Sequence, residues 1–316
     1  MAVIALGPCA ALAQPAKVYR VGFLGTASAS GYQREVEWIR DGLRRFGYEE
    51  GKNVAIEYRW ADGSAERLRQ IAGEFVAANV DAILVHNIPG ALAASRATST
   101  IPIVMADGAD PVAAGLAASL ARPGGNITGS TSFVPEESVK RLELLKQLAP
   151  AVRRIAFLST ASPPPAFTVT RKALERSAAS MGVAIHDFPV RDPAALPEAF
   201  RAMGAAAMDG VLVNNEPVLN AQANVIAALA SLARLPSAGY PTFADAGGLI
   251  AYGASRPALY GRAGYFLDRI FKGARAGELP FEQAAKFDLI LNQKTARALG
   301  MAIPSTLRLR ADRIIE

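Results

Sequence analysis

The sequence predicts an α/β fold of two similar, doubly wound lobes, each built on a parallel sheet, with a multi-strand hinge between them. The first observation is an internal repeat, in which residues 20–28 (RVGFLGTAS) return as residues 154–162 (RIAFLSTAS) with six of nine positions identical. The second is that residues 81–89 (DAILVHNIP) return as residues 209–217 (DGVLVNNEP). The third is the alternation of short apolar runs with amphipathic segments, which is typical of a parallel sheet covered by helices. Two equivalent lobes that face each other enclose a cleft.

The first copy predicts alternating strands and helices. Apolar residues lie on one face of the helix expected over residues 33–46, and Gly47 ends that helix as a C-terminal cap. Ser64 or Asp62 is a candidate N-cap for the next helix, and a third helix is expected near residues 90–98. The expected strands are 21–25, 54–58, 82–85, 103–105 and 127–129.

The second copy repeats this scheme. The spacing between the copies slips from 134 to 128 residues, which a short loop deletion in the second copy explains. Residues 129–133 are the expected first crossover between the lobes, and Pro280 breaks the pattern before the last strand. The expected helices are 135–148, 168–181, 196–203, 224–232 and 256–271, and the expected strands are 155–158, 183–186, 211–213, 237–240 and 286–291.

The charge of the chain points away from a nucleic-acid partner. The formal net charge is +6 and the pI is about 9.5, but Lys and Arg are scattered among Asp and Glu, as in residues 34–37 (REVE). Phosphate backbones are bound by clustered basic residues, and the sequence contains no basic run of five or more. We therefore expect no nucleic acid among the partners.

The N-terminal residues resemble an export signal. Residues 1–13 carry no charge, and residues 11–13 (ALA) before Gln14 and Pro15 have the small-x-small form of a signal-peptidase site. We expect residues 1–16 to be a signal-peptide remnant with its lead-in, and the mature protein to be periplasmic. Cys9 is the only cysteine, so its removal leaves no thiol for disulfides, metals or nucleophilic attack.

The sequence contains few residues or motifs that are typical of catalysis. No G-x-S-x-G, H-E-x-x-H or Walker motif is present, and the turn after the first strand lacks the glycine spacing that dinucleotides require. His86 and His186 each follow or end an expected strand, where a lone histidine is more often a loop residue than a base. We therefore expect no catalytic residue, no metal site and no cofactor.

The loops after the strands are the candidate ligand site. Ligands of open parallel sheets bind beyond the carboxyl ends of the strands, where helix N-termini present free N–H groups. Those groups suit a carboxylate, while Asp107 or Glu216 suits an ammonium; each acid is also a candidate helix cap. The predicted ligand-binding residues are Thr26, Ala27, Ser28, Asn87, Ile88, Asp107, Thr160, Ser162, Asn215, Glu216, Tyr240 and Asp245.

Several further segments carry a family resemblance. The most specific are residues 109–112 (ADPV) and 115–129 (GLAASLARPGGNITG), supported by the stretches 50–54 (EGKNV), 57–60 (EYRW), 247–249 (GGL) and 294–296 (KTA). With these motifs the chain resembles the substrate-binding proteins of ABC importers, in the type I periplasmic-binding family that includes tryptophan- and tyrosine-binding members.

The resemblance implies two Rossmann-like lobes joined by three crossovers, with a ligand between them and a membrane permease as partner. The expected lobes are residues 17–130 with 255–282, and residues 131–254 with 283–316. The implied ligand is a small molecule such as an amino acid or an aromatic or other organic acid. A monomer is the simpler expectation for a hinged receptor.

Two alternatives share this architecture. A nucleotide- or sugar-nucleotide-dependent enzyme, for instance a glycosyl transferase or a dehydrogenase, would need a phosphate-binding loop. The ligand-sensing core of a transcription repressor would need an N-terminal pair of DNA-binding helices, for which residues 1–20 have neither the length nor the charge.

Overall fold

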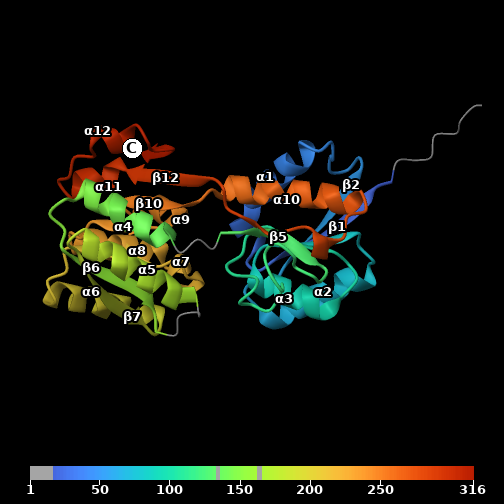
Figure 1. Cartoon of the computed structure of the whole chain (residues 1–316), viewed down its shortest axis with the longest axis horizontal. Helices are drawn as coiled ribbons and strands as arrows, with labels where there is room; N and C mark the ends of the chain where they lie inside the picture. The colour runs from blue at the N-terminus through green and yellow to red at the C-terminus, as the bar shows by residue number, and fades with distance from the viewer. Residues whose placement is uncertain (1–16, 133–135, 162–165) are drawn as a thin grey trace, which may run out of the picture.

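The structure, a computed structural model, describes residues 17–132, 136–161 and 166–316. Two sheets, each flanked by helices, lie side by side along the long axis of the molecule (Figure 1). Within those described ranges, none of the helices combines the length and the apolar character that a bilayer crossing requires.

The first sheet has six parallel strands in the order β2-β1-β3-β4-β5-β11. Its strands are β1 (Tyr19–Gly25), β2 (Val54–Trp60), β3 (Ala82–Val85), β4 (Ile103–Met105), β5 (Ile127–Thr131) and β11 (Glu282–Gln283). One core joins the sheet to α1 (Gln33–Arg44) and α10 (Arg256–Phe271), and a second core joins it to α2 (Ala65–Ala77) and α3 (Ile88–Ala97). The described helices therefore cover both faces of this sheet.

The second sheet has seven strands in the order β7-β6-β8-β9-β10-β12-β13. They are β6 (Arg154–Thr160), β7 (Ala184–Val190), β8 (Gly210–Val213), β9 (Ser237–Gly239), β10 (Ile250–Ala254), β12 (Phe287–Asn292) and β13 (Arg313–Ile315). On one face lie α4 (Glu136–Leu148) and α5 (Ala166–Ser180), and on the other lie α6 (Leu196–Ala205) and α8 (Ala223–Leu232). The shorter helices are α7 (Pro217–Ala221), α9 (Pro241–Asp245), α11 (Gln293–Ala298) and α12 (Ser305–Arg308).

The repeat seen in the sequence is a repeat of topology. The order β2-β1-β3-β4-β5 in the first sheet equals β7-β6-β8-β9-β10 in the second. An aspartate before the third strand does the same work in each copy, because Asp81 Oδ2 accepts a hydrogen bond from Arg20 N at 2.8 Å and Asp209 Oδ1 accepts one from Arg154 N at 2.8 Å. The predicted α/β fold of two doubly wound lobes is confirmed.

The second sheet departs from the sequence expectations in two respects. Residues 237–240 were expected to form the last strand before the helix over 256–271, but β10 lies between them. The sheet is also not purely parallel, since β12 runs antiparallel to β10 and β13 joins beyond it. The chain leaves the first sheet after β11 and enters the second sheet through a short connection. It therefore starts β12 beside the end of β10, and the two strands run in opposite directions.

Three connections link the two sheets: from β5 to α4, from β10 to α10 and from β11 to β12. They are hydrogen-bonded to one another, with Ser255 N donating to Lys286 O and Ala284 N donating to Thr131 O, both at 2.9 Å. Figure 1 shows α10 against the first sheet and β12 extending into the second. Bonded side by side, the connections form a compact joint rather than a single flexible linker.

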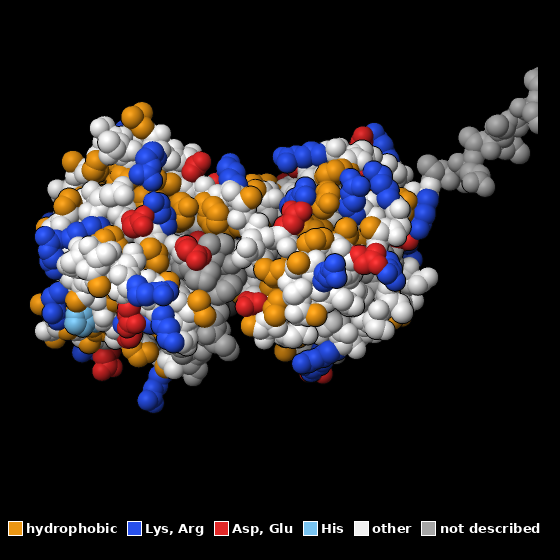
Figure 2. Space-filling view, viewed as in Figure 1, with side chains coloured by type: hydrophobic (Ala, Val, Ile, Leu, Met, Phe, Trp, Pro, Cys, Tyr) orange, Lys and Arg blue, Asp and Glu red, His pale blue; other side chains and the backbone are white. Residues whose placement is uncertain are grey.

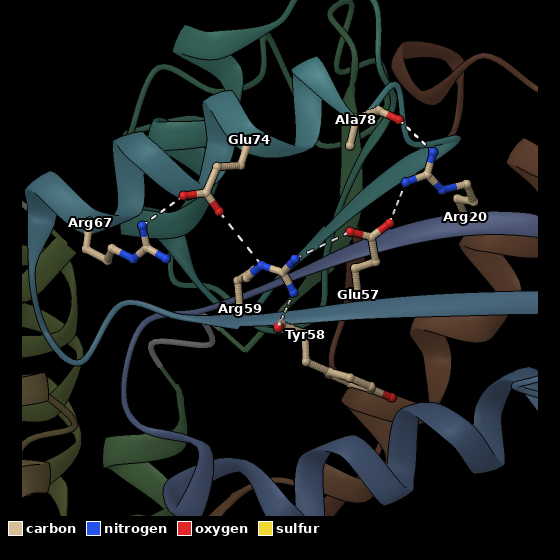
Figure 3. Close-up of polar contacts among 7 residues, drawn as sticks. All are labelled: Arg20, Glu57, Tyr58, Arg59, Arg67, Glu74 and Ala78. Carbon is tan, nitrogen blue, oxygen red and sulfur yellow. Dashed lines mark hydrogen bonds and ion pairs between the residues drawn. The ribbon is translucent and has the colours of Figure 1, made fainter.

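A series of ion pairs lies next to β2, an edge strand of the first sheet. Glu57 and Arg59 project from the edge strand β2 toward α2, where Glu74 and Arg67 continue the series (Figure 3). Arg20 Nη2 lies 2.6 Å from Glu57 Oε1, and Arg67 Nη1 lies 2.8 Å from Glu74 Oε1. Charged edges of this kind disfavour pairing with a foreign strand.

Candidate ligand-binding cavity

A cavity of about 280 Å³ lies between the two sheets, and both halves of the chain line it. The surface is indented between the two halves (Figure 2). In each sheet the strand order reverses next to the first strand, between β1 and β3 and between β6 and β8. The loops that leave neighbouring strands diverge at such a point and open a crevice. The two crevices face each other across the cavity.

Five of the predicted ligand residues line the cavity, and all five follow strands. They are Asn87, Asp107, Asn215, Glu216 and Tyr240. Asn87 and Asp107 come from the first half and the other three from the second, so the cavity combines strand ends that lie far apart in the sequence.

Two predicted threonines support the lining instead of forming it. Thr26 accepts a hydrogen bond from Asn87 Nδ2 at 3.3 Å and is 2.7 Å from the hydroxyl of Tyr32. Thr160 donates from its backbone N–H to Glu216 Oε1 at 3.1 Å and from its hydroxyl to Glu216 Oε2. The matching threonines of the two repeats thus each hold a polar residue of the neighbouring loop.

Other predicted residues lie elsewhere. Ala27, Ser28 and Ile88 are not among the residues that line the cavity, and Asp245 ends α9, where it is 2.7 Å from Arg313 Nη1. Ser162 falls outside the described residues.

Several charged and aromatic residues of the lining were not predicted from the sequence. Arg256 begins α10 directly after β10, so recognition of that strand would have placed it at a strand end. Glu137 and Arg141 lie one helical turn apart on the buried face of α4, where apolar residues are the rule. The lining residues that were not predicted include His86, Glu137, Arg141, Phe167 and Arg256.

Glu137 and Arg141 form an ion pair that is almost fully buried, with side chains 8% and 2% exposed. Arg141 Nη2 lies 2.6 Å from Glu137 Oε2, and Arg141 Nε donates to the carbonyl of Tyr252 at 2.7 Å. Glu137 Oε1 accepts from the backbone N–H of Ala254 at 3.0 Å. Burial raises the pKa of Glu137 and lowers that of Arg141. The pair therefore fastens α4 to the end of β10, where the chain crosses to the first sheet.

Asp107 and Arg256 line the cavity, and each contains a buried polar atom without a partner in the described part of the chain. Asp107 Oδ1 and Arg256 Nε are buried, and neither has a hydrogen-bond partner among the described residues. Arg256 Nη2 is held by Glu35 Oε1 at 2.7 Å, which fixes the guanidinium while 30% of the side chain stays exposed. Burial raises the pKa of Asp107, and a hydrogen bond with Ser132 and then the nearby Arg256 oppose this rise. A buried polar atom without a partner is destabilising by about 1–3 kcal/mol, so both atoms favour a polar guest.

Aromatic rings back the cavity in the first half. The His86 ring lies edge-on to Tyr32 at 4.9 Å and stacks on Tyr260 at 5.7 Å, and Tyr32 in turn stacks on Trp60 at 5.3 Å. Burial, with a smaller contribution from Arg256, lowers the pKa of His86 to about 3. The histidine is therefore neutral at physiological pH.

The arrangement suits the capture of a small polar molecule. An acid and a base with unpaired atoms, amides, and the aromatic side chain of Phe167 converge on one cavity. Within the described parts of the chain, no group of three or more His, Cys, Asp or Glu could hold a metal ion.

Comparison with known proteins gives a consistent family match. A family model described as ABC transporter substrate binding protein matches residues 21–315. A tyrosine-binding protein of Clostridioides difficile (strain R20291) is 26% identical over 256 residues, which cover 81% of this chain and 73% of the relative.

Two solved structures show the same fold. A conserved domain protein from Vibrio cholerae O1 biovar El Tor is 27% identical with a TM-score of 0.81, covering 94% of this chain and 100% of that chain. The ABC domain in complex with L-Trp from Streptococcus pneumonia is 23% identical with a TM-score of 0.83, covering 95% of this chain and 100% of that chain.

Proposed function

The chain belongs to the family of ABC transporter substrate binding proteins, and from this premise we propose that it captures an amino acid in the interlobe cavity for delivery to a membrane permease. The observation that carries the choice of ligand is the pair of unpaired buried atoms, Asp107 Oδ1 and Arg256 Nε. An α-ammonium group supplies the donor that Asp107 lacks, and an α-carboxylate supplies the acceptor that Arg256 lacks. The tyrosine-binding relative is consistent with such a ligand.

In the proposed mechanism the two lobes act as units, residues 17–130 with 255–282 and residues 131–254 with 283–316. The protein works outside the cytoplasm as a monomer, and it releases its ligand chemically unchanged. The bonded crossovers serve as the hinge, so that closing the lobes covers the ligand and presents the loaded form to the permease.

The test is a thermal-shift screen of the twenty amino acids, followed by calorimetry. For L-tyrosine as probe, two analogues separate the charges: 3-(4-hydroxyphenyl)propanoate lacks the ammonium and tyramine lacks the carboxylate. A ligand at 100 times its Kd stabilises the protein by about 2.7 kcal/mol. We expect a free amino acid to be bound more tightly than its analogue without the ammonium.

A matched pair of variants ties this result to the cavity. Asp107→Asn removes the charge opposite the ammonium and is expected to weaken amino-acid binding about 10- to 100-fold, the range of a charged hydrogen bond. Asp41→Asn, an exposed position on α1 that is 51% accessible, keeps full affinity. Stabilisation only by nucleotides or sugar nucleotides would instead support an enzyme on the same fold.

A further inference from the structure

Tyr260 and His86 form a buried contact behind the cavity. The hydroxyl of Tyr260 is hydrogen-bonded to Nδ1 of His86, and the side chain of Tyr260 is fully buried in α10. His86 follows β3 and lines the cavity, whereas Tyr260 does not line it. The Nδ1 edge of the imidazole is therefore turned into the lobe, and Nε2 has no hydrogen bond to any residue in the described part of the chain.

The neighbours of Tyr260 fix the direction of this bond. Arg256 Nη2 lies 3.5 Å from the Tyr260 hydroxyl oxygen, and a guanidinium can only donate. The hydroxyl oxygen can therefore only accept on the Arg256 side. Among the described residues His86 Nδ1 is the one acceptor within hydrogen-bond distance of the hydroxyl, so its proton is directed there. Burial raises the pKa of Tyr260 well above its usual value, so the hydroxyl keeps that proton. A neutral imidazole that accepts at Nδ1 carries its own proton on Nε2.

We propose that Tyr260 is a positioning residue, which holds His86 in the tautomer whose Nε2–H faces the interlobe cavity and so makes this point of the site a hydrogen-bond donor. The proposal rests on the function proposed above and adds a requirement to it. The bound molecule must place an acceptor, such as a carboxylate, carbonyl or hydroxyl oxygen, against His86. A ligand that places a donor at this point sets two hydrogen-bond donors against each other, which is unfavourable.

The contact with Arg256 extends the same logic to the charged residues. Glu35 holds the guanidinium, the guanidinium orients the Tyr260 hydroxyl, and the hydroxyl orients the imidazole. Arg256 and His86 therefore present donors to the same cavity, which together suit the two oxygens of one carboxylate or a carboxylate and a second oxygen.

Nitrogen NMR reads the tautomer directly in the ligand-free protein. The chain contains only His86 and His186, so a long-range ¹H–¹⁵N spectrum of ¹⁵N-histidine-labelled protein shows two rings, and His186→Gln assigns them. We expect His86 to show a protonated Nε2 and an unprotonated Nδ1. In Tyr260→Phe, which keeps the ring and loses the hydroxyl, the two shifts should converge as the tautomers mix. A His86 ring protonated at Nδ1 in the wild type, or an unchanged pattern in Tyr260→Phe, overturns the proposal.

Binding of L-tyrosine as probe gives the second readout. Tyr260→Phe should bind it at least 10-fold more weakly than the wild type. Tyr48→Phe is the matched control, because Tyr48 is also buried in the first lobe and donates to Asp268 Oδ1 at 3.3 Å, away from the cavity; it should change neither the His86 spectrum nor the affinity. Equal affinity in wild type and Tyr260→Phe contradicts the proposal. Failure of the wild type to bind any amino acid contradicts the proposed function, and the tautomer measurement still decides the role of Tyr260.

Discussion

The charged residues of the cavity lining fall into two groups, those whose polar atoms are paired and those with an unpaired atom. Arg141 and Glu137 satisfy each other and two backbone groups, whereas Asp107 and Arg256 keep unpaired atoms. These two situations have different physical consequences. A satisfied buried pair fixes structure, because removing one partner strands the other charge. An unpaired buried polar atom is unfavourable in the ligand-free protein, so a ligand that forms a hydrogen bond with it binds more tightly.

The first prediction concerns the satisfied pair. Arg141→Met leaves the Glu137 carboxylate buried without its cation, and we expect the free energy of unfolding to fall by about 3–5 kcal/mol. The double variant Glu137→Gln with Arg141→Met removes both charges and keeps an acceptor for Ala254 N, so it should be less destabilised than Arg141→Met alone. Urea unfolding of both variants and of Glu137→Gln measures the coupling. Additive losses would show that the pair is not coupled.

The second prediction concerns His86 and pH. The pKa of this histidine falls from 6.5 to about 3 on folding, so the unfolded chain binds the proton first as the solution is acidified. The contribution of His86 to stability is therefore complete above pH 6.5 and is lost as the pH falls from there toward 3, at up to about 1.4 kcal/mol per pH unit. His86→Gln has no imidazole at this position, so its stability lacks this pH-dependent contribution.

The measurement is the difference in unfolding free energy between wild type and His86→Gln from pH 7 to pH 4.5, which cancels the titration of the other groups. We expect the difference to shift by about 2–3 kcal/mol in favour of the variant. His186→Gln, on β7 of the other lobe, serves as the control. A difference that stays constant over this range would show that His86 titrates normally.

At this scale the sequence was informative where a residue followed a recognised strand. Asn87 and Glu216 belong to the repeated segments, so their place at strand ends could be read from the alignment of the two copies. Arg256 could not, because β10 was not recognised, and Tyr260 looks like an ordinary apolar-face residue of a helix. The role of each depends on a partner from a distant part of the chain, Glu35 for Arg256 and His86 for Tyr260.

Among the elements, α1 and α10 pack at unusually close range. A Cβ added to Gly42 would lie 2.1 Å from the carbonyl oxygen of Gly261, and one added to Gly264 would lie 2.3 Å from the carbonyl carbon of Gly42. The absence of a side chain at Gly42 and Gly264 thus lets the two backbones meet directly. This contact positions α10, and with it Arg256 and Tyr260, against the first lobe.

The third prediction follows from that contact. Gly42→Ala should lower the free energy of unfolding by about 1–3 kcal/mol, because the methyl group meets backbone that cannot move aside. Gly73→Ala on α2 meets nothing within 4 Å, and there the higher helix propensity of alanine should stabilise the protein by about 0.5–1 kcal/mol. Thermal or urea unfolding compares the two. Effects of equal sign would contradict the proposed packing role of Gly42.

Element recognition from sequence worked where periodicity was strong. The helices over α1, α4 and α10 and the strands of the repeat have clear apolar faces or runs. β10 reads IAYGA, a short run whose fourth residue is glycine and which ends just before a helix, and glycine weakens a strand pattern. β13 has three residues and only β12 as a partner, and its pairing is set by tertiary contact. β2 was recognised from its sequence, but the ion pairs between β2 and its neighbours β1 and α2 (Figure 3) depend on partners that the sequence pattern does not identify.

For the whole molecule, the doubling of one unit explains both the shape and the position of the cavity. Each copy brings its own crevice to the carboxyl ends of its strands, and the crossovers hold the two crevices face to face. The sequence repeat was enough to predict two lobes and a cleft. It could not predict which side chains meet across that cleft, because the relative placement of the lobes depends on hydrogen bonds such as that from Ser255 N to Lys286 O.

The fourth prediction concerns movement of the lobes. If an amino acid bridges Asp107 and Arg256 to the second lobe, binding must favour arrangements in which the lobes lie closer together, since a ligand shifts an equilibrium only through differential contacts. Small-angle X-ray scattering should therefore give a smaller radius of gyration with the amino acid that stabilises the protein most in the thermal screen. At a ligand concentration near the wild-type Kd, Asp107→Asn should show a smaller decrease in the radius than the wild type, because it binds the amino acid more weakly. An unchanged radius at a saturation verified by calorimetry would mean that the ligand fits a cavity already formed, and that the bonded crossovers act as a rigid joint instead of a hinge.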